Sequence, residues 1–262
     1  MAEELNWGAE AVDPSERSLP GLKARFLIDH APSHGRVLEI GSGDGKNLRT
    51  LAAAMPELTL LGCDVREPRT PADCYEFFKI EDALPKPLRH TCDAVLVFDV
   101  LEHVPDPAAT LDDALAALKP DGKLIAFVPV EGEPLSAYTF FKATLGRDVF
   151  VETKEHIQAF RHRELRALIE SRFDVVEWHY AYHALGQFMD AGFFAAQRMS
   201  KLRDLWRRDN AYYNADKKDV GGAGGMMNQL LRLGNLLAWA ESTALRDVRF
   251  ASAGALFVGK AR

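Results

Sequence analysis

A carboxylate and a run of glycines sit together near the start of this sequence. Glu39 lies in an apolar run that ends in Gly41, Gly43 and Gly45. A carboxylate in a strand buried on both faces needs a partner or a function. The glycines let a ligand approach the backbone, and a helix beginning at Lys46 would direct free N–H groups toward that ligand. The segment therefore predicts a binding site for a polar ligand.

A second carboxylate ends the next apolar run. Asp64 follows the run Leu58–Cys63 and stands 19 residues after Gly45. An acid at the tip of a second strand, at about this distance from a glycine turn, is placed to accept hydrogen bonds from ribose hydroxyls. Asp also commonly follows strands as a turn residue, but the spacing favours ribose binding.

Three residues with reactive side chains follow the apolar run Asp93–Phe98, namely Asp99, Glu102 and His103. In one interpretation, Glu102 and His103 are structural. In the second, His103 is a general base, because an imidazole with a pKa of about 6.5 can accept a hydroxyl proton. In the third, the cluster holds a metal ion. All three remain open, and the metal carries the least weight.

A second histidine with two interpretations is His156, in the polar segment 155–162. It is either a second catalytic histidine or a polar loop residue. The segment 131–160 before it is a long connection that carries Tyr138, Phe140, Phe141 and Phe150. These aromatic side chains either line the substrate side of the site or simply pack the loop, and their position after the fifth strand favours the substrate side.

Apolar runs that alternate with helical patterns predict a doubly wound α/β sheet. Ligands in such sheets bind at the carboxyl ends of the strands, where Glu39, Asp64 and Asp99 would meet. A helix from about Leu19 to Ala31 either covers the sheet or acts as a flap. The predicted strands are Arg36–Ile40, Leu58–Cys63, Tyr75–Ile80, Asp93–Phe98, Lys123–Val130, Phe173–His179 and Gly254–Lys260.

Two further amphipathic helices are predicted between the last two strands. One passes through Leu185 and Phe188 toward a basic stretch at 198–208, and the other runs from Met226 to about Arg246. They could cap an apolar substrate, form a dimer contact, lie on a membrane surface or simply pack on the sheet. We favour the cap.

Composition narrows the functional classes. The 262 residues carry a net charge of −6, which gives no support to a nucleic-acid partner. The three cysteines show no metal-binding spacing, and this indicates reduced thiols in a cytoplasmic protein. No signal peptide is predicted at residues 1–10, and no apolar run is long enough to span a membrane.

Taken in order, these segments resemble the class I S-adenosylmethionine (SAM)-dependent methyltransferases of the small-molecule, quinone-biosynthesis type. The resemblance covers roughly residues 20–182 and the last strand. It rests on Val37–Gly45, Asp64, Asp82, the segment 98–106 and the segment 118–124. A nicotinamide enzyme fits less well, because its fingerprint needs a glycine where Lys46 stands.

The resemblance implies a Rossmann-like, seven-stranded, mostly parallel sheet with an antiparallel last strand. It divides the chain into a core at 1–182, a helical insertion at 183–250 and the last strand at 251–262. The cofactor-binding residues would be Glu39, Gly41, Gly43, Gly45, Asp64, Val65, Asp82, Ala83 and Asp99.

Each group in that set has an implied role. Glu39 would orient the amino end of the methionine moiety, and Asp99 would face the same end. Asp64 would bind the ribose, while Asp82 and Ala83 would meet the adenine.

The implied reaction is O- or C-methylation of a small apolar or amphipathic acceptor. His103 and His156 are the candidate catalytic residues, and no metal is expected. A homodimer and a peripheral membrane contact are further expectations. The alternative is a non-catalytic subunit that binds SAM or its demethylated product.

Overall fold

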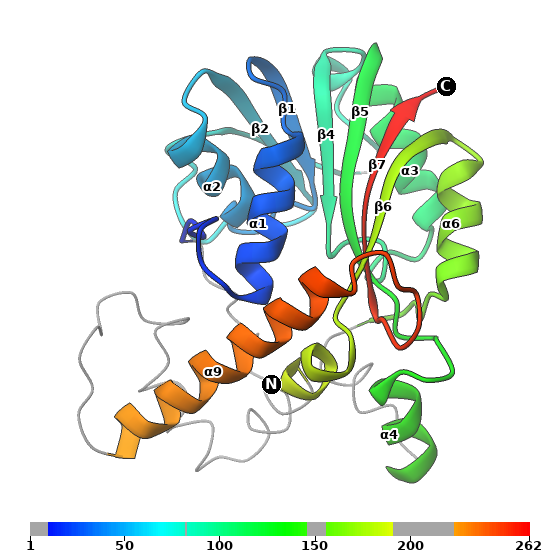
Figure 1. Cartoon of the computed structure of the whole chain (residues 1–262). Coiled ribbons are helices and arrows are strands. Elements are labelled where there is room, and N and C mark those ends of the chain that lie inside the picture. The colour runs from blue at the N-terminus through cyan, green and yellow to red at the C-terminus, as the bar shows by residue number, and fades with distance from the viewer. Residues whose placement is uncertain (1–9, 82, 146–155, 191–222) are drawn as a thin grey trace.

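The sheet of this protein has seven strands in the order β3-β2-β1-β4-β5-β7-β6 (Figure 1). The computed structural model describes residues 10–81, 83–145, 156–190 and 223–262. The strands are β1 (Gly35–Ile40), β2 (Leu58–Asp64), β3 (Glu76–Lys79), β4 (Cys92–Phe98), β5 (Leu118–Pro129), β6 (Phe173–Ala181) and β7 (Gly254–Ala261).

The first five strands pair in parallel, and β7 pairs antiparallel with both β5 and β6. The sequence prediction of a Rossmann-like sheet with an antiparallel last strand is therefore confirmed. The order places β1 and β4 side by side in the centre, so chain segments that leave these two strands emerge next to each other. This is the switch point at which ligands bind in doubly wound sheets.

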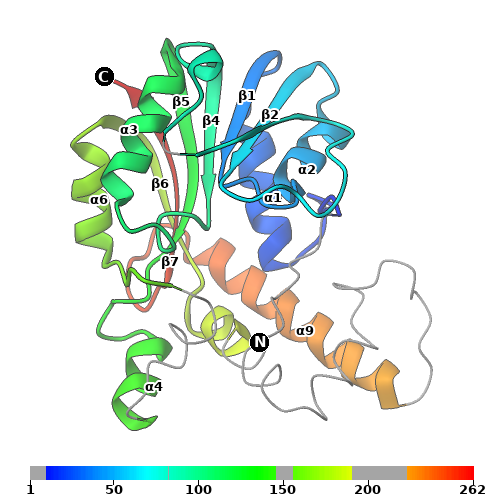
Figure 2. The ribbon, with the colours of Figure 1, turned by 180° about the vertical axis from the view of Figure 1, so that it is seen from behind.

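Helices cover both faces of the sheet (Figures 1 and 2). The helices are α1 (Leu19–His30), α2 (Lys46–Ala54), α3 (Pro107–Ala117), α4 (Ala137–Leu145), α6 (His162–Glu170) and α9 (Ala223–Ala244). Alternate strand residues face opposite sides. Leu96 therefore packs in the apolar cluster of α1 and α2, whereas Val95 and Val97 pack in the cluster of α3 and α6.

Capping residues define where the first helix begins and ends. The Ser18 hydroxyl accepts a hydrogen bond from the Gly21 N–H at 3.1 Å, and Pro20 occupies the first turn, where its missing N–H costs nothing. Pro32 ends the helix. Its buried residues Phe26 and Leu27 pack on the sheet, so α1 covers the core as one of its two interpretations predicted.

Two elements differ from the sequence prediction. Strand β5 begins at Leu118 rather than Lys123, because Leu118 already pairs with Cys92 before the register shifts. The long connection after β5 contains the helix α4, whose apolar residues carried too little periodicity to predict it.

The described parts of the insertion lie beyond the carboxyl ends of the parallel strands (Figure 1). Residues 184–190 are helical, and α9 contacts α1 and β6. The basic stretch 198–208 lies outside the described residues. Leu230, Leu233 and Leu237 on α9 are exposed. The domain boundaries at 182–183 and 250–251 stay predictions. No helix among the described residues has the length and apolarity to cross a membrane.

The central strand β4 should dominate stability. Leu96 is fully buried, so Leu96→Ala should lower the free energy of unfolding by about 2–5 kcal/mol through lost contacts and a cavity. Leu233→Ala is the matched control. The same chemical change on a side chain that is 51% exposed should cost less than about 0.5 kcal/mol. Urea unfolding followed by circular dichroism measures both. Equal losses in the two variants would contradict the assignment of Leu96 to the core.

Candidate functional site

The glycine turn between β1 and α2 is shaped by close neighbours on two sides. A Cβ atom at position 41 would collide with Val100, and one at position 45 would collide with the Tyr75 ring. Gly43, with φ of 49°, has nothing within 4 Å of where a Cβ would lie. The backbone at Gly43 therefore faces open space, and a ligand can approach it there.

Glu39 lies in β1 directly below this turn and is 3% exposed. Its Oε1 accepts a hydrogen bond from the Asn47 side chain at 2.7 Å, but its Oε2 has no partner. Burial, together with the nearby charges of Asp64 and Asp99, raises the pKa of this carboxyl to about 8, although the hydrogen bond from Asn47 opposes the rise. A cationic ligand group beside Oε2 would restore the charged form.

Two further polar atoms beside the turn are buried without a partner, the Ser42 hydroxyl and the Tyr75 hydroxyl. Together with Glu39 Oε2 they form a group of orphaned polar atoms around the open backbone. Buried polar atoms are normally hydrogen-bonded. Their presence fits a polar ligand at this place. Neither Ser42 nor Tyr75 was proposed as a site residue, although Ser42 lies within the glycine motif itself.

Asp64 ends β2 and is joined to the glycine turn. Its Oδ2 accepts from the Gly43 N–H at 2.9 Å and its Oδ1 from the Arg66 N–H at 3.0 Å. The carboxylate has four lone-pair sites, so two remain for a ligand. Val65 beside it is 62% exposed, and Ala83 is exposed as well. Asp82 lies outside the described residues, so its proposed adenine contact stays a prediction.

Asp99 follows β4 and is paired with a lysine that the sequence analysis did not select. Lys23 on α1 donates to both carboxylate oxygens of Asp99, at 2.9 and 2.7 Å. Its ammonium also lies 3.6 Å from the centroid of the Phe127 ring. The pKa of the partly buried Lys46 is lowered, first by burial and then by the charge of Lys23. Two cations therefore stand close to Asp99 at the end of β4.

A second group of reactive side chains lies after β4 and β5. The rings of His103 and His156 are 4.8 Å apart and nearly perpendicular. Glu102 is 1% exposed, and neither of its carboxylate oxygens has a hydrogen-bond partner among the described residues. The Nε2 atom of His103 lies 3.8 Å from its Oε1. Burial raises its pKa well above the ordinary range, and the charge of Asp99 adds to that rise.

The two predicted catalytic histidines differ in exposure. The His103 side chain is 38% exposed, whereas His156 is 6% exposed and bonded through Nδ1 to Glu131. His156 does lie in a loop, but its imidazole is buried and paired rather than solvated. Both interpretations of His156 stay predictions. The structure brings both histidines together, as expected of residues that act at one site.

This second group also has the donors for a metal ion. Glu102, His103 and His156 each offer one ligand atom, and these atoms lie within 4.8 Å of one another. A divalent cation there would favour the ionised form of Glu102 and would offset the free-energy cost of burying this carboxylate. The expectation of no metal stays a prediction.

Comparison with known proteins now identifies the family. A family model described as a methyltransferase domain matches residues 13–177. This covers more than half of the chain and includes both groups of residues described above.

The chain belongs to this methyltransferase family. It is a class I SAM-dependent methyltransferase, and its orphaned polar atoms around the glycine turn fit that cofactor. The family match therefore supports an enzyme rather than a non-catalytic subunit.

Individual relatives agree with this placement. The methyltransferase is 29% identical over 180 residues to a ubiquinone biosynthesis O-methyltransferase of Xylella fastidiosa, covering 62% of this chain and 70% of the relative. It is 30% identical over 128 residues to a protein of the same name from Neisseria meningitidis serogroup C, covering 44% of this chain and 52% of that one. The match thus spans between about half and 70% of the relatives' lengths.

A solved structure extends the likeness to most of the chain. The cyclase SpnF superposes with a TM-score of 0.54 at 17% identity, covering 93% of this chain and 79% of SpnF. At this identity the likeness concerns the fold alone. That a protein titled a cyclase has the same fold illustrates that fold does not decide chemistry.

The buried Glu39 makes the stability of the free methyltransferase depend on pH. Its pKa is raised from 4.5 to about 8 in the folded state, so the folded protein binds more protons than the unfolded chain between these values. Its stabilising contribution is complete below pH about 4.5 and is lost as the pH rises through about 8. Glu39→Gln should abolish this loss, which is on the order of a few kcal/mol.

This dependence is tested by measuring the free energy of unfolding in urea for the wild type and for Glu39→Gln, at about four pH values between 5 and 8. Asp174→Asn is the control, because Asp174 is exposed and pairs only with Arg262 among the described residues; it should keep the wild-type slope. Parallel curves for wild type and Glu39→Gln would contradict the buried, protonated carboxyl.

Proposed function

We propose that this enzyme transfers the methyl group of SAM to a hydroxyl oxygen of a small apolar or amphipathic molecule. The observation that carries the proposal is the contact between His103 and His156, whose rings are 4.8 Å apart. A hydroxyl must give up its proton when its oxygen is methylated, and an imidazole is suited to receive it. An activated carbon has less need of such a base. The two O-methyltransferase relatives support the same choice.

In this proposal the residues around the glycine turn hold the cofactor. Gly41, Gly43 and Gly45 line its methionine and ribose portion. Asp64 accepts hydrogen bonds from the two ribose hydroxyls through the lone pairs that Gly43 and Arg66 leave free. Val65, Asp82 and Ala83 meet the adenine.

The methionine end of the cofactor is a zwitterion, and the proposed site has charged side chains of both signs to bind it. Glu39 ionises when an ammonium group lies beside its unpartnered Oε2. Lys23, which pairs with Asp99 in the free protein, and Lys46 would hold the ligand carboxylate, and Asp99 would face the ammonium. Lys23 thus joins the site to α1, which adds the flap role to the covering role of this helix.

When bound, SAM supplies an electrophilic sulfonium methyl group. The chain contributes alignment and the exclusion of water. His103 or His156 receives the proton of the acceptor hydroxyl at an imidazole nitrogen. The buried Tyr138 and the exposed leucines of α9 support an apolar or amphipathic acceptor on this side. Phe150 lies outside the described residues, and its part in the substrate wall stays a prediction.

The net charge of −6 supports a small-molecule acceptor over a nucleic acid. A homodimer or a membrane surface as a further partner of α9 remains a prediction.

A labelled-methyl assay tests the proposed reaction. Purified enzyme and methyl-labelled SAM are incubated with a panel of phenols that carry an alkyl chain, and mass spectrometry then locates the methyl group. We expect the methyl group on oxygen. Transfer to carbon would contradict the proposed acceptor atom, and binding of SAM without any transfer would contradict the proposed activity.

Asp64→Ala tests the assigned cofactor site. Loss of hydrogen bonds to the ribose should weaken SAM binding by more than about 1 kcal/mol, measured by isothermal titration. Asp174→Ala, on β6 and paired with Arg262, is the matched control and should bind SAM as the wild type does. An unchanged dissociation constant for Asp64→Ala would remove Asp64 from the site.

The expectation that no metal takes part is tested with a chelator. Turnover should be the same before and after treatment with EDTA, because the proposed proton transfer uses imidazole alone. Loss of turnover that Mg²⁺ or Mn²⁺ restores would instead assign a divalent cation to Glu102, His103 and His156. His103→Ala would then also reduce the metal bound per chain, measured by mass spectrometry.

A further inference from the structure

A second carboxylate touches the histidine pair, at a position for which no role has been assigned. Glu131 directly follows the buried Val130 at the end of β5, and its side chain is 7% exposed. Its Oε2 lies 2.9 Å from Nδ1 of His156, whose side chain is also 7% exposed. The two groups are therefore held together away from bulk water.

The chemistry of this contact selects one form of the imidazole. An ionised carboxylate only accepts hydrogen bonds, so Nδ1 of His156 must carry the hydrogen. In the neutral ring Nε2 then has the lone pair and is the nitrogen that can accept a proton. Carboxylates that contact histidines in this way fix both the tautomer and the orientation of the ring.

Backbone hydrogen bonds hold the two partners in register. The Gly132 N–H donates to the carbonyl of Phe160 at 2.9 Å, which ties the segment of Glu131 to the segment of His156. The N–H groups of Ile157 and Gln158 both donate to the carbonyl of Glu102, at 2.8 and 3.0 Å. The segments that carry Glu102, Glu131 and His156 are thus joined at their backbones.

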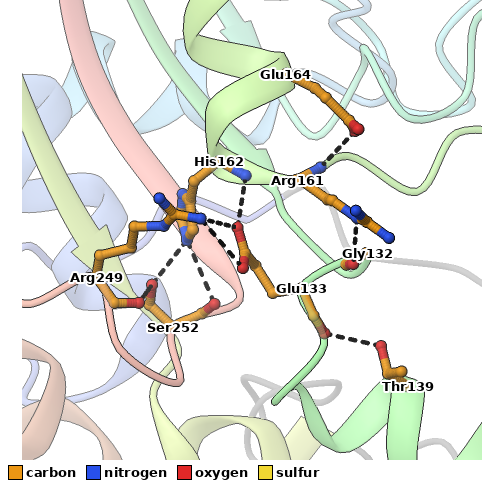
Figure 3. A network of polar contacts seen from close by, with 8 residues as sticks. All are labelled: Gly132, Glu133, Thr139, Arg161, His162, Glu164, Arg249 and Ser252. Atoms are coloured by element: carbon orange, nitrogen blue, oxygen red, sulfur yellow. Dashed lines mark hydrogen bonds and ion pairs between the residues drawn. The ribbon is translucent and has the colours of Figure 1, made fainter.

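Figure 3 shows how the far side of this junction is anchored. Arg161 Nε donates to the carbonyl of Gly132 at 3.2 Å. The carboxylate of Glu133 accepts from the backbone N–H of His162 at 2.9 Å and from Arg249 at 3.1 Å. None of these three contacts involves His156, so the two acidic residues of the loop have different partners. Glu133 fixes the loop, and Glu131 fixes the imidazole.

We propose that Glu131 is a positioning residue for methyl transfer, which holds His156 with hydrogen on Nδ1 and keeps Nε2 free for the acceptor proton. The proposal rests on the proposed function, because it takes His156 as the group that receives this proton. Glu131 itself acts only through the imidazole.

Glu131→Gln is the first test. It keeps the size of the side chain but removes the charge that requires hydrogen on Nδ1. We expect kcat to fall on the order of 10- to 100-fold, while KM for SAM stays unchanged because Glu131 does not contact the cofactor site. Glu170→Gln is the matched control. It makes the same change on α6, where the Glu170 side chain is 45% exposed and pairs with Arg166, and its kcat should stay within about threefold of wild type. An unchanged kcat in Glu131→Gln would overturn the positioning role.

A double variant tests whether Glu131 acts through His156. If it does, Glu131→Gln combined with His156→Ala should be no slower than His156→Ala alone. Once the imidazole of His156 is gone, Glu131 has nothing left to position, so its loss has no additional effect on kcat. Multiplied losses in the double variant would overturn the proposal, since a general structural role would lower kcat independently of His156.

Nitrogen-15 NMR of the wild-type protein labelled at histidine gives a readout that requires neither turnover nor a folded variant. We expect the long-range couplings of His156 to place the hydrogen on Nδ1. Hydrogen on Nε2 would overturn the proposal. If the wild type shows this tautomer but no methyl transfer to any acceptor, the proposed function fails while the contact between Glu131 and His156 stands.

Discussion

A carboxylate buried in the middle of a parallel sheet is the constraint on which this site depends. Glu39 is covered by β2 and β4 on its two sides and keeps one oxygen without a partner. Removing a charge from water is costly, so the free protein holds this group protonated at neutral pH. A ligand that brings a cation to Oε2 recovers that cost. The same burial thus accounts for the raised pKa of Glu39 and, in the proposed function, for its affinity for the amino end of SAM.

The same principle acts at the second group of residues. Glu102 is buried beside His103, and neither of its oxygens is hydrogen-bonded. Buried polar groups without partners are rare in native proteins and indicate strain, function or an absent ligand. Both carboxylates lie at the ends of the two central strands, β1 and β4. The sheet order thus places one buried acid in β1 and another shortly after β4, at the same edge of the sheet.

Helix α1 joins the cofactor site to the rest of the molecule. Its apolar residues Phe26 and Leu27 pack on the sheet, while Lys23 on the same helix reaches Asp99. A helix that is anchored by its apolar face can carry one polar side chain to the ligand with little loss of freedom on binding. The covering role of this helix is thus observed, and its flap role belongs to the proposed function.

The sequence alone determined the fold class, the glycine turn and the place of Asp64, because strand alternation and glycine spacing are local properties that repeat along the chain. It also indicated that the segment after Val130 would reach the ligand edge. It could not select Lys23 or Glu131. Lys23 meets Asp99 across 76 positions and Glu131 meets His156 across 25, and no periodicity records such contacts. Only the tertiary structure decided that His156 is buried and paired, since the exposure of a loop residue depends on the segments that pack against it.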